Sequence, residues 1–183
     1  MPGVFFNDGV IWLGGEGGSG PVDIAAGDIS GFMDYNDTTG DVAMTADTWT
    51  DVPNNGAGAF TNKTYPPTGV SELLDVATGK IDPTELDLGD SMFIRLDVTV
   101  TPTINNSRLE MQFTLGGGGG EYTLPLDSTR LDDGSGKGYR FVREFKIYMG
   151  DTNTRDNPIG LQVKCSSAAT LNNAGVAITV VNR

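Results

Sequence analysis

A regular alternation of apolar and polar residues over Met92–Leu115 constrains the fold of this chain more than any other feature. The even-numbered residues of Met92–Thr101 are all apolar, and the odd-numbered residues from Arg95 onward are polar. After a break at Pro102–Asn106, the alternation resumes with odd-numbered apolar residues over Leu109–Leu115. Because successive side chains of a strand point to opposite faces, the pattern predicts two half-buried strands joined by a turn.

A half-buried sheet needs a second layer over its apolar face, and little of the remaining sequence has a helical pattern. Further alternating stretches occur at Val42–Asp47, Tyr122–Leu126, Phe141–Met149, Ile159–Cys165 and Val176–Val180. The 26 glycines and nine prolines suit short strands joined by tight turns. We therefore expect an all-β fold, a jelly-roll-like antiparallel β-sandwich with an extended N-terminal arm.

The 183 residues are enough for one sizeable core. We assign residues 1–41 to an extended, glycine-rich N-terminal arm and residues 42–183 to the sandwich domain. Two apolar clusters in the arm precede the glycine tract Gly14–Gly20, which is typical of a flexible joint. A second patch between Ile24 and Tyr35 is interpreted as extended chain with local turns.

The apolar clusters of the arm are candidates for docking on another molecule, because such a short segment cannot form its own core. The residues concerned are Phe5, Phe6, Val10, Ile11 and Trp12. The alternative is that these side chains close one end of the sandwich or add an edge strand to it. Both interpretations stay open at the level of the sequence.

The composition argues against several classes of function. A formal charge of -12 repels nucleic acid and anionic membranes, so we expect neither as a partner. Without histidine, the chain lacks the usual general base and the commonest transition-metal ligand, and its single cysteine, Cys165, cannot form an internal disulfide. The sequence has no apolar run long enough to span a bilayer and no recognisable secretory signal, so we expect synthesis and use without the secretory route.

No motif with a specific chemistry stands out. Gly15–Gly20 has the glycine spacing of a dinucleotide-binding loop, but no βαβ pattern surrounds it. Asp132–Asp133 and Asp37–Asp41 could offer oxygen ligands to calcium, yet neither has the EF-hand spacing, and solvated turn residues are the simpler interpretation. A pair of carboxylates could hydrolyse glycosides, but the sequence does not indicate which two. We expect no enzyme activity, no cofactor and no metal.

Four local features give predictions of their own. Asp82–Glu85 has a capping residue, a proline and an acidic residue in the order that predicts one turn of helix. Leu73–Val76 is interpreted as a short strand, and Gly116–Gly120 as a mobile loop. Arg143 falls on an otherwise apolar strand face, so it should lie near the strand end or pair with a carboxylate, and a subunit interface is one place for such a pair.

Several segments together resemble a known group of proteins. They are Trp49–Tyr65 (WTDVPNNGAGAFTNKTY), Ile81–Leu86 (IDPTEL), Leu88–Asp90 (LGD), Ile94–Val100 (IRLDVTV), Tyr148–Asp151 (YMGD), Asn153–Thr154 and Asn157–Pro158. This set resembles tailed-bacteriophage virion proteins whose jelly roll is similar to the heads of tumour necrosis factor and complement C1q. The likeness covers about residues 42–182, and its motifs belong to the fold rather than to an active site.

The resemblance implies a homotrimer displayed on a virion, made in the host cytoplasm. The best match is a capsid decoration (cement) protein on the outer surface of the head, docked through the N-terminal arm on the major capsid protein, on other virion subunits or on neighbouring copies. The absence of a long fibrous shaft favours decoration over a complete fibre.

The alternative is a tail-fibre or head-fibre module that binds a receptor or a host-surface glycan. Aromatic side chains that could stack on a sugar ring are Trp49, Tyr65, Tyr122 and Tyr139. Each of them could equally be part of the packing of the sandwich.

Overall fold

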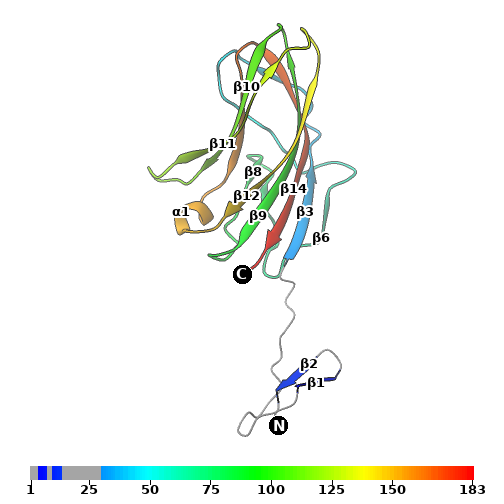
Figure 1. The fold of residues 1–183 in the computed structure, drawn as a ribbon, viewed down its shortest axis with the longest axis vertical. Coiled ribbons are helices and arrows are strands. Elements are labelled where there is room, and N and C mark those ends of the chain that lie inside the picture. Colours follow the sequence, from blue (N-terminus) through cyan, green and yellow to red (C-terminus); the bar gives the residue numbers. More distant parts are fainter. Residues whose placement is uncertain (1–3, 8–9, 14–29) are drawn as a thin grey trace.

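Two antiparallel β-sheets packed face to face make up the body of the protein (Figure 1). The computed structural model describes residues 4–7, 10–13 and 30–183. Among these residues, no helix is long and apolar enough to cross a membrane.

The larger sheet has six strands and contains the longest strands of the chain. Five of them follow one another across the sheet in this order: β12 (Tyr139–Tyr148), β9 (Ser91–Pro102), β14 (Ala169–Val181), β3 (Ser30–Asn36) and β6 (Asn62–Tyr65). The sixth strand, β4 (Val42–Met44), pairs with the start of β14. The sequence marked only the second half of β14, because Gly175 and the asparagines before it interrupt the apolar alternation.

The smaller sheet has four strands. Their order is β11 (Tyr122–Leu131), β10 (Ser107–Leu115), β13 (Gly160–Cys165) and β5 (Thr50–Asp51). Two further pairs lie outside these sheets: β7 (Leu74–Asp75) with β8 (Lys80–Ile81), and β1 (Val4–Asn7) with β2 (Val10–Leu13). The short strand β7 lies within the predicted Leu73–Val76.

The chain passes repeatedly from one sheet to the other. Successive strands β9 and β10, β11 and β12, β12 and β13, and β13 and β14 each lie in different sheets. All pairings within the sheets are antiparallel, as in a jelly roll. The predicted all-β, jelly-roll-like sandwich is therefore confirmed, and the predicted strands at Met92–Thr101 and Leu109–Leu115 are β9 and β10.

The core lies between the two sheets, where the apolar residues of each alternating strand meet. The inward residues of β9 are fully buried: Met92, Ile94, Leu96, Val98 and Val100. Leu109, Met111 and Phe113 of β10 face them from the other sheet and are at most 1% exposed. Complete burial of one such side chain contributes about 1.5–3 kcal/mol, so the alternation of these two strands supplies much of the stability of the fold.

Strand β3 lies inside the range 1–41 that the sequence analysis assigned to an arm. It pairs with β14 over its whole length, and its inward residues Met33 and Tyr35 are fully buried in the core. The strands of the sandwich therefore begin at Ser30. The division of the chain into an arm and an independently folding domain stays a prediction.

Strand β14 contains a β-bulge, which changes its register against β9. The register shifts between Asn173 and Gly175, and Gly175 has a φ of +139°. A Cβ atom there would lie 2.3 Å from the carbonyl oxygen of Tyr35, so only glycine fits. The side chain of Asn173 accepts the N–H of Gly175 and donates to the carbonyl of Pro53, so hydrogen bonds hold the bulge against the neighbouring loop.

The predicted helical turn at Asp82–Glu85 is wrong. The Asp82 side chain does accept a hydrogen bond from the N–H of Thr84, but the carboxylate of Glu85 turns away to the backbone N–H groups of Ser71 and Glu72. The N–H of Asp82, which a capping box would leave for Glu85, donates instead to the carbonyl of Leu73. A turn closed by a hydrogen bond from the N–H of Leu86 to the carbonyl of Pro83 replaces the helix.

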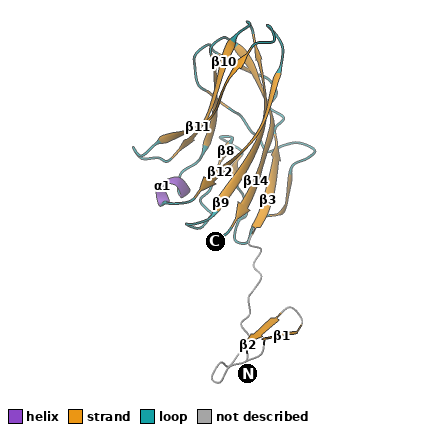
Figure 2. Cartoon of the chain, in the orientation of Figure 1, coloured by secondary structure: helices purple, strands orange, loops and turns teal. Residues whose placement is uncertain are grey.

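The one helix among the described residues is α1 (Thr152–Arg155), a single turn drawn in purple in Figure 2. The carboxylate of Asp151 caps its N-terminus by accepting the N–H of Thr154 at 2.8 Å. This helix follows the YMGD segment and lies beside the lower end of β11, where the hydroxyl of Tyr122 meets that of Thr154 at 2.8 Å.

The run Gly116–Gly120 forms a turn that is hydrogen-bonded to α1, and its predicted mobility stays a prediction. The side chain of Asn153 in α1 accepts the N–H of Gly117 at 3.1 Å and donates to the carbonyl of Gly120 at 2.9 Å. A Cβ atom on Gly117 would lie 2.1 Å from the Oδ1 atom of Asn157. Gly117 therefore permits the close approach of this turn to the end of α1, whereas a Cβ atom on Gly118 or Gly119 would have no described atom within 4 Å.

Candidate interaction surface

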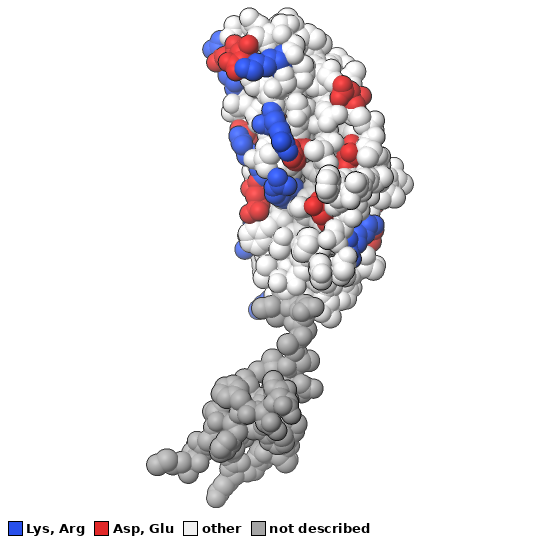
Figure 3. All heavy atoms as spheres, turned by 90° about the vertical axis from the view of Figure 1, so that its right-hand side faces the viewer, with Lys and Arg blue, Asp and Glu red and all other residues white. Residues whose placement is uncertain are grey.

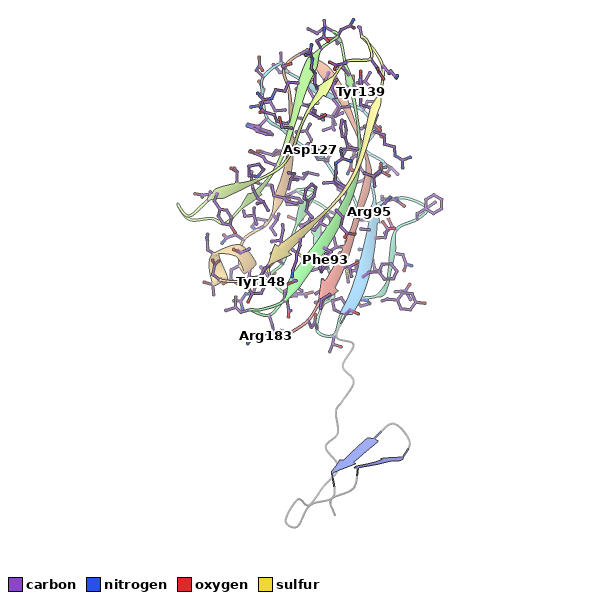
Figure 4. The ribbon with its side chains drawn as sticks, in the orientation of Figure 1. Phe93, Arg95, Asp127, Tyr139, Tyr148 and Arg183 are labelled. Atoms are coloured by element: carbon purple, nitrogen blue, oxygen red, sulfur yellow. The ribbon has the colours of Figure 1, made fainter. Side chains whose placement is uncertain are left out.

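The outward face of the six-stranded sheet carries large apolar side chains where a water-facing sheet would carry polar ones. Phe93 and Tyr148 lie on this side of the sheet, as Figure 4 shows. We name the surface the aromatic face and define it by its apolar residues: Phe32, Phe60, Tyr65, Phe93, Val142, Tyr148 and Val181. All but Phe60 are side chains of strands, so the sheet itself sets their spacing.

One row of the sheet holds the centre of the aromatic face. Across five neighbouring strands, the residues aligned in this row are Lys146, Phe93, Thr179, Phe32 and Tyr65. The rings of Phe32 and Tyr65 are stacked with centroids 5.8 Å apart, and the ammonium of Lys146 lies 5.5 Å from the centroid of Phe93. Cross-strand pairs of this kind stabilise the sheet, but they leave the outer sides of the rings open to solvent.

The exposure of these side chains is unusual for their type. Phe60 is 79% exposed, Tyr65 61% and Tyr148 56%. Phe60 stands in a loop in which the Asn55 side chain accepts the N–H groups of Thr38 and Ala57. Apolar area gathered on one face, with a polar surround, is typical of an interaction site.

Small residues of β14 form a hollow beside the aromatic row. Gly175 and Ala177 contribute little side chain, and a depression with a volume of about 160 Å³ lies over them, with Asp34 and Arg95 among the residues that line it. Burial raises the pKa of the Asp34 carboxyl, and the charge of nearby Arg95 acts in the opposite direction. The hollow therefore combines an apolar floor with charged walls.

The charges on the outward positions of β12, β9, β14 and β3 are balanced, although the whole chain carries a charge of -12. The basic residues are Arg95, Arg140 and Lys146, and the acidic residues are Asp34, Asp97 and Glu144. Figure 3 shows the neighbouring side of the molecule, where uncharged surface fills wide areas between separate charged groups. Copies of an acidic protein repel one another least where the charge is balanced.

The guanidinium of Arg140 forms a two-pronged contact with the carboxylate of Asp97, with its Nε atom 2.8 Å from one oxygen. These hydrogen bonds hold the pKa of Asp97 below its usual value. Arg95, Lys146 and Glu144 make no ion pair with any other described residue. The aromatic face thus retains charged groups that are free to pair with another molecule.

The outward face of the smaller sheet is different. Asp51, Gln162 and Gln112 form a ladder of side-chain hydrogen bonds of 2.8 and 3.0 Å across three strands. In the next row, Glu110 pairs with both Lys164 and Arg108. This face has satisfied its polar groups within the protomer, as expected of a surface that meets water.

The structure does not bring the predicted sugar-stacking residues together. Trp49 is half-buried beneath the ammonium of Lys164 on the smaller sheet, and Tyr65 lies on the aromatic face. Tyr122 is at the end of β11, and Tyr139 is packed against the core. These four residues occupy separate regions and form no common site.

The other predicted residues fall into two groups. The side chains of Phe5, Phe6, Val10, Ile11 and Trp12 lie outside the described part of the structure, so their docking role stays a prediction. Arg143 pairs with Asp127 of β11 at 3.0 Å, which confirms the predicted carboxylate partner. The pair links the edges of the two sheets.

The predicted calcium ligands have partners of other kinds. Asp132 pairs with Arg130, and Asp133 pairs with Lys137. One oxygen of Asp37 accepts hydrogen bonds from Thr39 and Asn55. Within residues 30–183, no three acidic or cysteine side chains are grouped in a way that could hold a metal ion.

Sequence reasoning missed the aromatic face, although one signal for it was present. Phe93 occupies a position on the polar side of the Met92–Thr101 alternation, and Val142 and Tyr148 occupy equivalent positions in β12. A large apolar residue on the polar side of a half-buried strand indicates a second contact. That these positions lie on one surface follows from the sheet order and not from any single strand.

Comparison with known proteins finds a fold likeness without a family. No family model matches the chain, and no curated protein matches it. Among solved structures, it is similar to Eiger TNF from S. frugiperda with 15% identity and a TM-score of 0.44, over 84% of this chain and 91% of that one.

Two viral structures are similar at the same level. One is the infectious bursal disease virus VP2 subviral particle, with 10% identity and a TM-score of 0.48; the match covers all of this chain but only 38% of that one. The other is the PRD1 vertex protein P5, with 16% identity and a TM-score of 0.41, over 84% of this chain and 72% of that one. With TM-scores below 0.5, these likenesses carry no argument about function.

Proposed function

We propose that this protein is a virion structural protein, a homotrimeric capsid decoration (cement) protein of a tailed bacteriophage that stabilises the outer surface of the head. The observation that carries the proposal is the aromatic face on a jelly roll whose sequence segments resemble phage virion proteins. In a protein without histidine, a large exposed apolar face fits assembly better than catalysis.

The proposed mechanism is mechanical. Each protomer contributes one N-terminal arm, and Phe5, Phe6, Val10, Ile11 and Trp12 bury apolar surface on capsid subunits. In a trimer, the second and third arms bind from a high local concentration once the first has bound. Several weak contacts then hold the trimer firmly on the shell without any single strong site.

Copy number in purified particles is the first experiment. Quantitative mass spectrometry should find hundreds of copies of this chain per particle if it covers the shell. A few copies per particle would instead favour the alternative, a tail-fibre or head-fibre module that binds a receptor or glycan. Absence of the chain from particles would refute the virion proposal altogether.

The arm is tested by Trp12→Ala in the whole protein. We expect binding to undecorated shells to weaken at least tenfold while the oligomeric state and the circular dichroism spectrum stay unchanged. Ile104→Ala, which removes an exposed apolar side chain outside both the arm and the aromatic face, is the matched control for shell binding. Normal binding by the Trp12 variant would rule out the arm as the attachment element.

A further inference from the structure

We propose that the hollow over Gly175 and Ala177 binds a small zwitterion, an α-amino acid with an apolar side chain. A carboxylate and a guanidinium stand on opposite walls of this hollow without pairing with each other. One ligand that carries both charges can pair with the two walls at once. The site lies within one protomer and does not depend on the virion proposal.

The two charged walls are Asp34 and Arg95, which face each other across strand β14. Both are aligned with Ala177, Asp34 from β3 on one side and Arg95 from β9 on the other. Two strand spacings, about 10 Å, separate the backbones of β3 and β9, and the small side chain of Ala177 leaves the space between them open. Neither charged residue forms an ion pair with any described residue.

A buried acceptor without a partner stands next to Asp34. Asn36 follows it on the same side of β3 and also lines the hollow, and its Nδ2 group donates to the carbonyl of Ala174 at 3.2 Å. The Oδ1 atom of Asn36 is buried and accepts no hydrogen bond from any described residue. Buried acceptors normally have a donor. An ammonium group has three N–H donors, so it can serve this oxygen and the carboxylate of Asp34 together.

Arg95 is the partner for the carboxylate of the ligand, because its planar guanidinium can donate two parallel hydrogen bonds to a carboxylate. The acidic residues near it do not use it. Asp97 is held by Arg140, whose Nε atom lies 2.8 Å from one of its oxygens. Glu144 is aligned with Arg95 on β12, on the side of β9 away from the hollow, and forms no ion pair with a described residue.

Phe60 supplies an apolar wall. Its side chain is 79% exposed and borders the hollow. The hydroxyl of Thr61, the next residue, accepts the N–H of Asn36 at 3.1 Å and donates to the carbonyl of Gly56 at 3.2 Å. The loop that carries Phe60 is therefore joined to the strand that carries the acidic wall. An amino acid held by its two charges presents its side chain in a third direction, where this ring can cover it.

Volume and charge together favour a small zwitterion over other ligands. The hollow measures about 160 Å³. This is similar to the roughly 150 Å³ of a cavity that takes up benzene and less than the roughly 300–1,000 Å³ of pockets for drug-sized ligands. A simple anion would lie against the carboxylate of Asp34, and a simple cation would lie against Arg95. A short zwitterion avoids both repulsions.

Isothermal titration calorimetry of the full-length protein with leucine tests the site. We expect a dissociation constant of about 1 mM or lower, the range open to a ligand with few atoms. Two analogues each lack one charge: leucinamide has no carboxylate, and isocaproate has no ammonium. Each should bind at least tenfold more weakly than leucine, because one wall of the hollow then lacks its partner.

Substitutions in the walls and the floor separate these contacts. Asp34→Asn and Arg95→Gln should each weaken leucine binding at least tenfold, and Ala177→Leu, which fills the hollow without a change in charge, should abolish it. Asp34→Asn should bind isocaproate at least as well as the parent protein does, since the repelling carboxylate is gone, and a misfolded variant would not. Arg108→Gln, the same charge change on the smaller sheet, should bind leucine normally.

Circular dichroism confirms that each variant is folded. Equal affinity for leucine and its two analogues would overturn the zwitterion site, as would full affinity in the Ala177→Leu variant or no detectable binding of leucine to the folded parent protein. The copy number in particles is measured independently of these titrations, so this site and the virion proposal can fail separately.

Discussion

Tyr35 shows how a single side chain joins distant parts of this sandwich. Its ring is fully buried, its hydroxyl donates to the carboxylate of Glu72, and the same oxygen accepts the N–H of Leu73 at 2.9 Å. Burial and the hydrogen bond to Glu72 both raise the pKa of the phenol, so it remains a neutral donor. Lys63 completes the group by pairing with Glu72. One hydroxyl thus connects β3 to the loop before β7.

Tyr35→Phe should lower the free energy of unfolding by about 1–2 kcal/mol, because the buried N–H of Leu73 and the carboxylate of Glu72 lose a partner while the packing of the ring is kept. Urea unfolding measures the change. Tyr148→Phe, at an exposed position, is the control and should differ from the parent by less than about 0.5 kcal/mol. Equal effects of the two substitutions would contradict the role assigned to the Tyr35 hydroxyl.

The Asp97–Arg140 pair should make stability depend on pH in the acid range. The pKa of Asp97 is lowered in the folded state, so the unfolded chain binds a proton more readily. The contribution of the pair is present in full above the unfolded pKa of about 4 and disappears as the pH falls through the lower pKa of the folded state.

Asp97→Asn should therefore cost about 1 kcal/mol at pH 7, a modest value because Arg140 is largely exposed. The difference from the parent protein should shrink steadily below pH 4. Urea midpoints measured from pH 7 to pH 2 at one protein concentration give the result. A difference that is constant across this range would show that the ion pair contributes nothing specific.

At the scale of elements, the conformation adopted by a glycine run or a capping pattern depended on which distant segments lay beside it. Both Asp82–Glu85 and Asp151–Thr154 begin with a residue that can cap a helix, yet only the second becomes one. The carboxylate of Glu85 found better donors in another loop. Five consecutive glycines likewise predicted a mobile loop, and in the structure the side chain of Asn153 hydrogen-bonds to two of them, Gly117 and Gly120. Local signals of this kind are outweighed when a distant segment offers hydrogen bonds.

Asn153→Ala should loosen the glycine turn and the end of β11 that follows it. Loss of the two hydrogen bonds is expected to lower the free energy of unfolding by about 1–2 kcal/mol and to speed amide exchange at Gly117. Hydrogen-exchange mass spectrometry over residues 116–124 measures the second effect. Asn105→Ala, in an exposed turn, should leave that segment unchanged. Undiminished protection in the Asn153 variant would show that this side chain does not hold the turn, and a lack of protection in the parent protein would support the mobile loop.

At the scale of the whole molecule, the predicted boundary between the arm and the domain can be compared with the core of residues 30–183. Within residues 30–183, the buried apolar residues begin at Met33. The sandwich has two complete sheets within residues 30–183. The predicted division into an arm and an autonomous domain can therefore be tested by truncation at Ser30 rather than at residue 41, because a cut at residue 41 would remove β3 from the six-stranded sheet.

Deletion of residues 1–29 should leave a folded sandwich whose urea midpoint is close to that of the parent protein. Deletion of residues 1–41 should unfold it, because Met33 and Tyr35 would leave the core. Circular dichroism and urea titration distinguish the two. A sandwich that tolerates the longer deletion would show that β3 is dispensable and would support the boundary at residue 41.

The sequence by itself determined the fold class and most of the core, because an alternation of period two fixes which side of a strand is buried wherever that strand lies. Ile94 and Phe113 could be placed inside from this pattern alone. Which outward residues share a surface was decided only by the tertiary structure. Phe93 and Phe32 are 61 positions apart and become neighbours only because β14 runs between their strands. That adjacency depends on sheet order, which arises from the packing of the whole chain and leaves no periodic trace in any one segment.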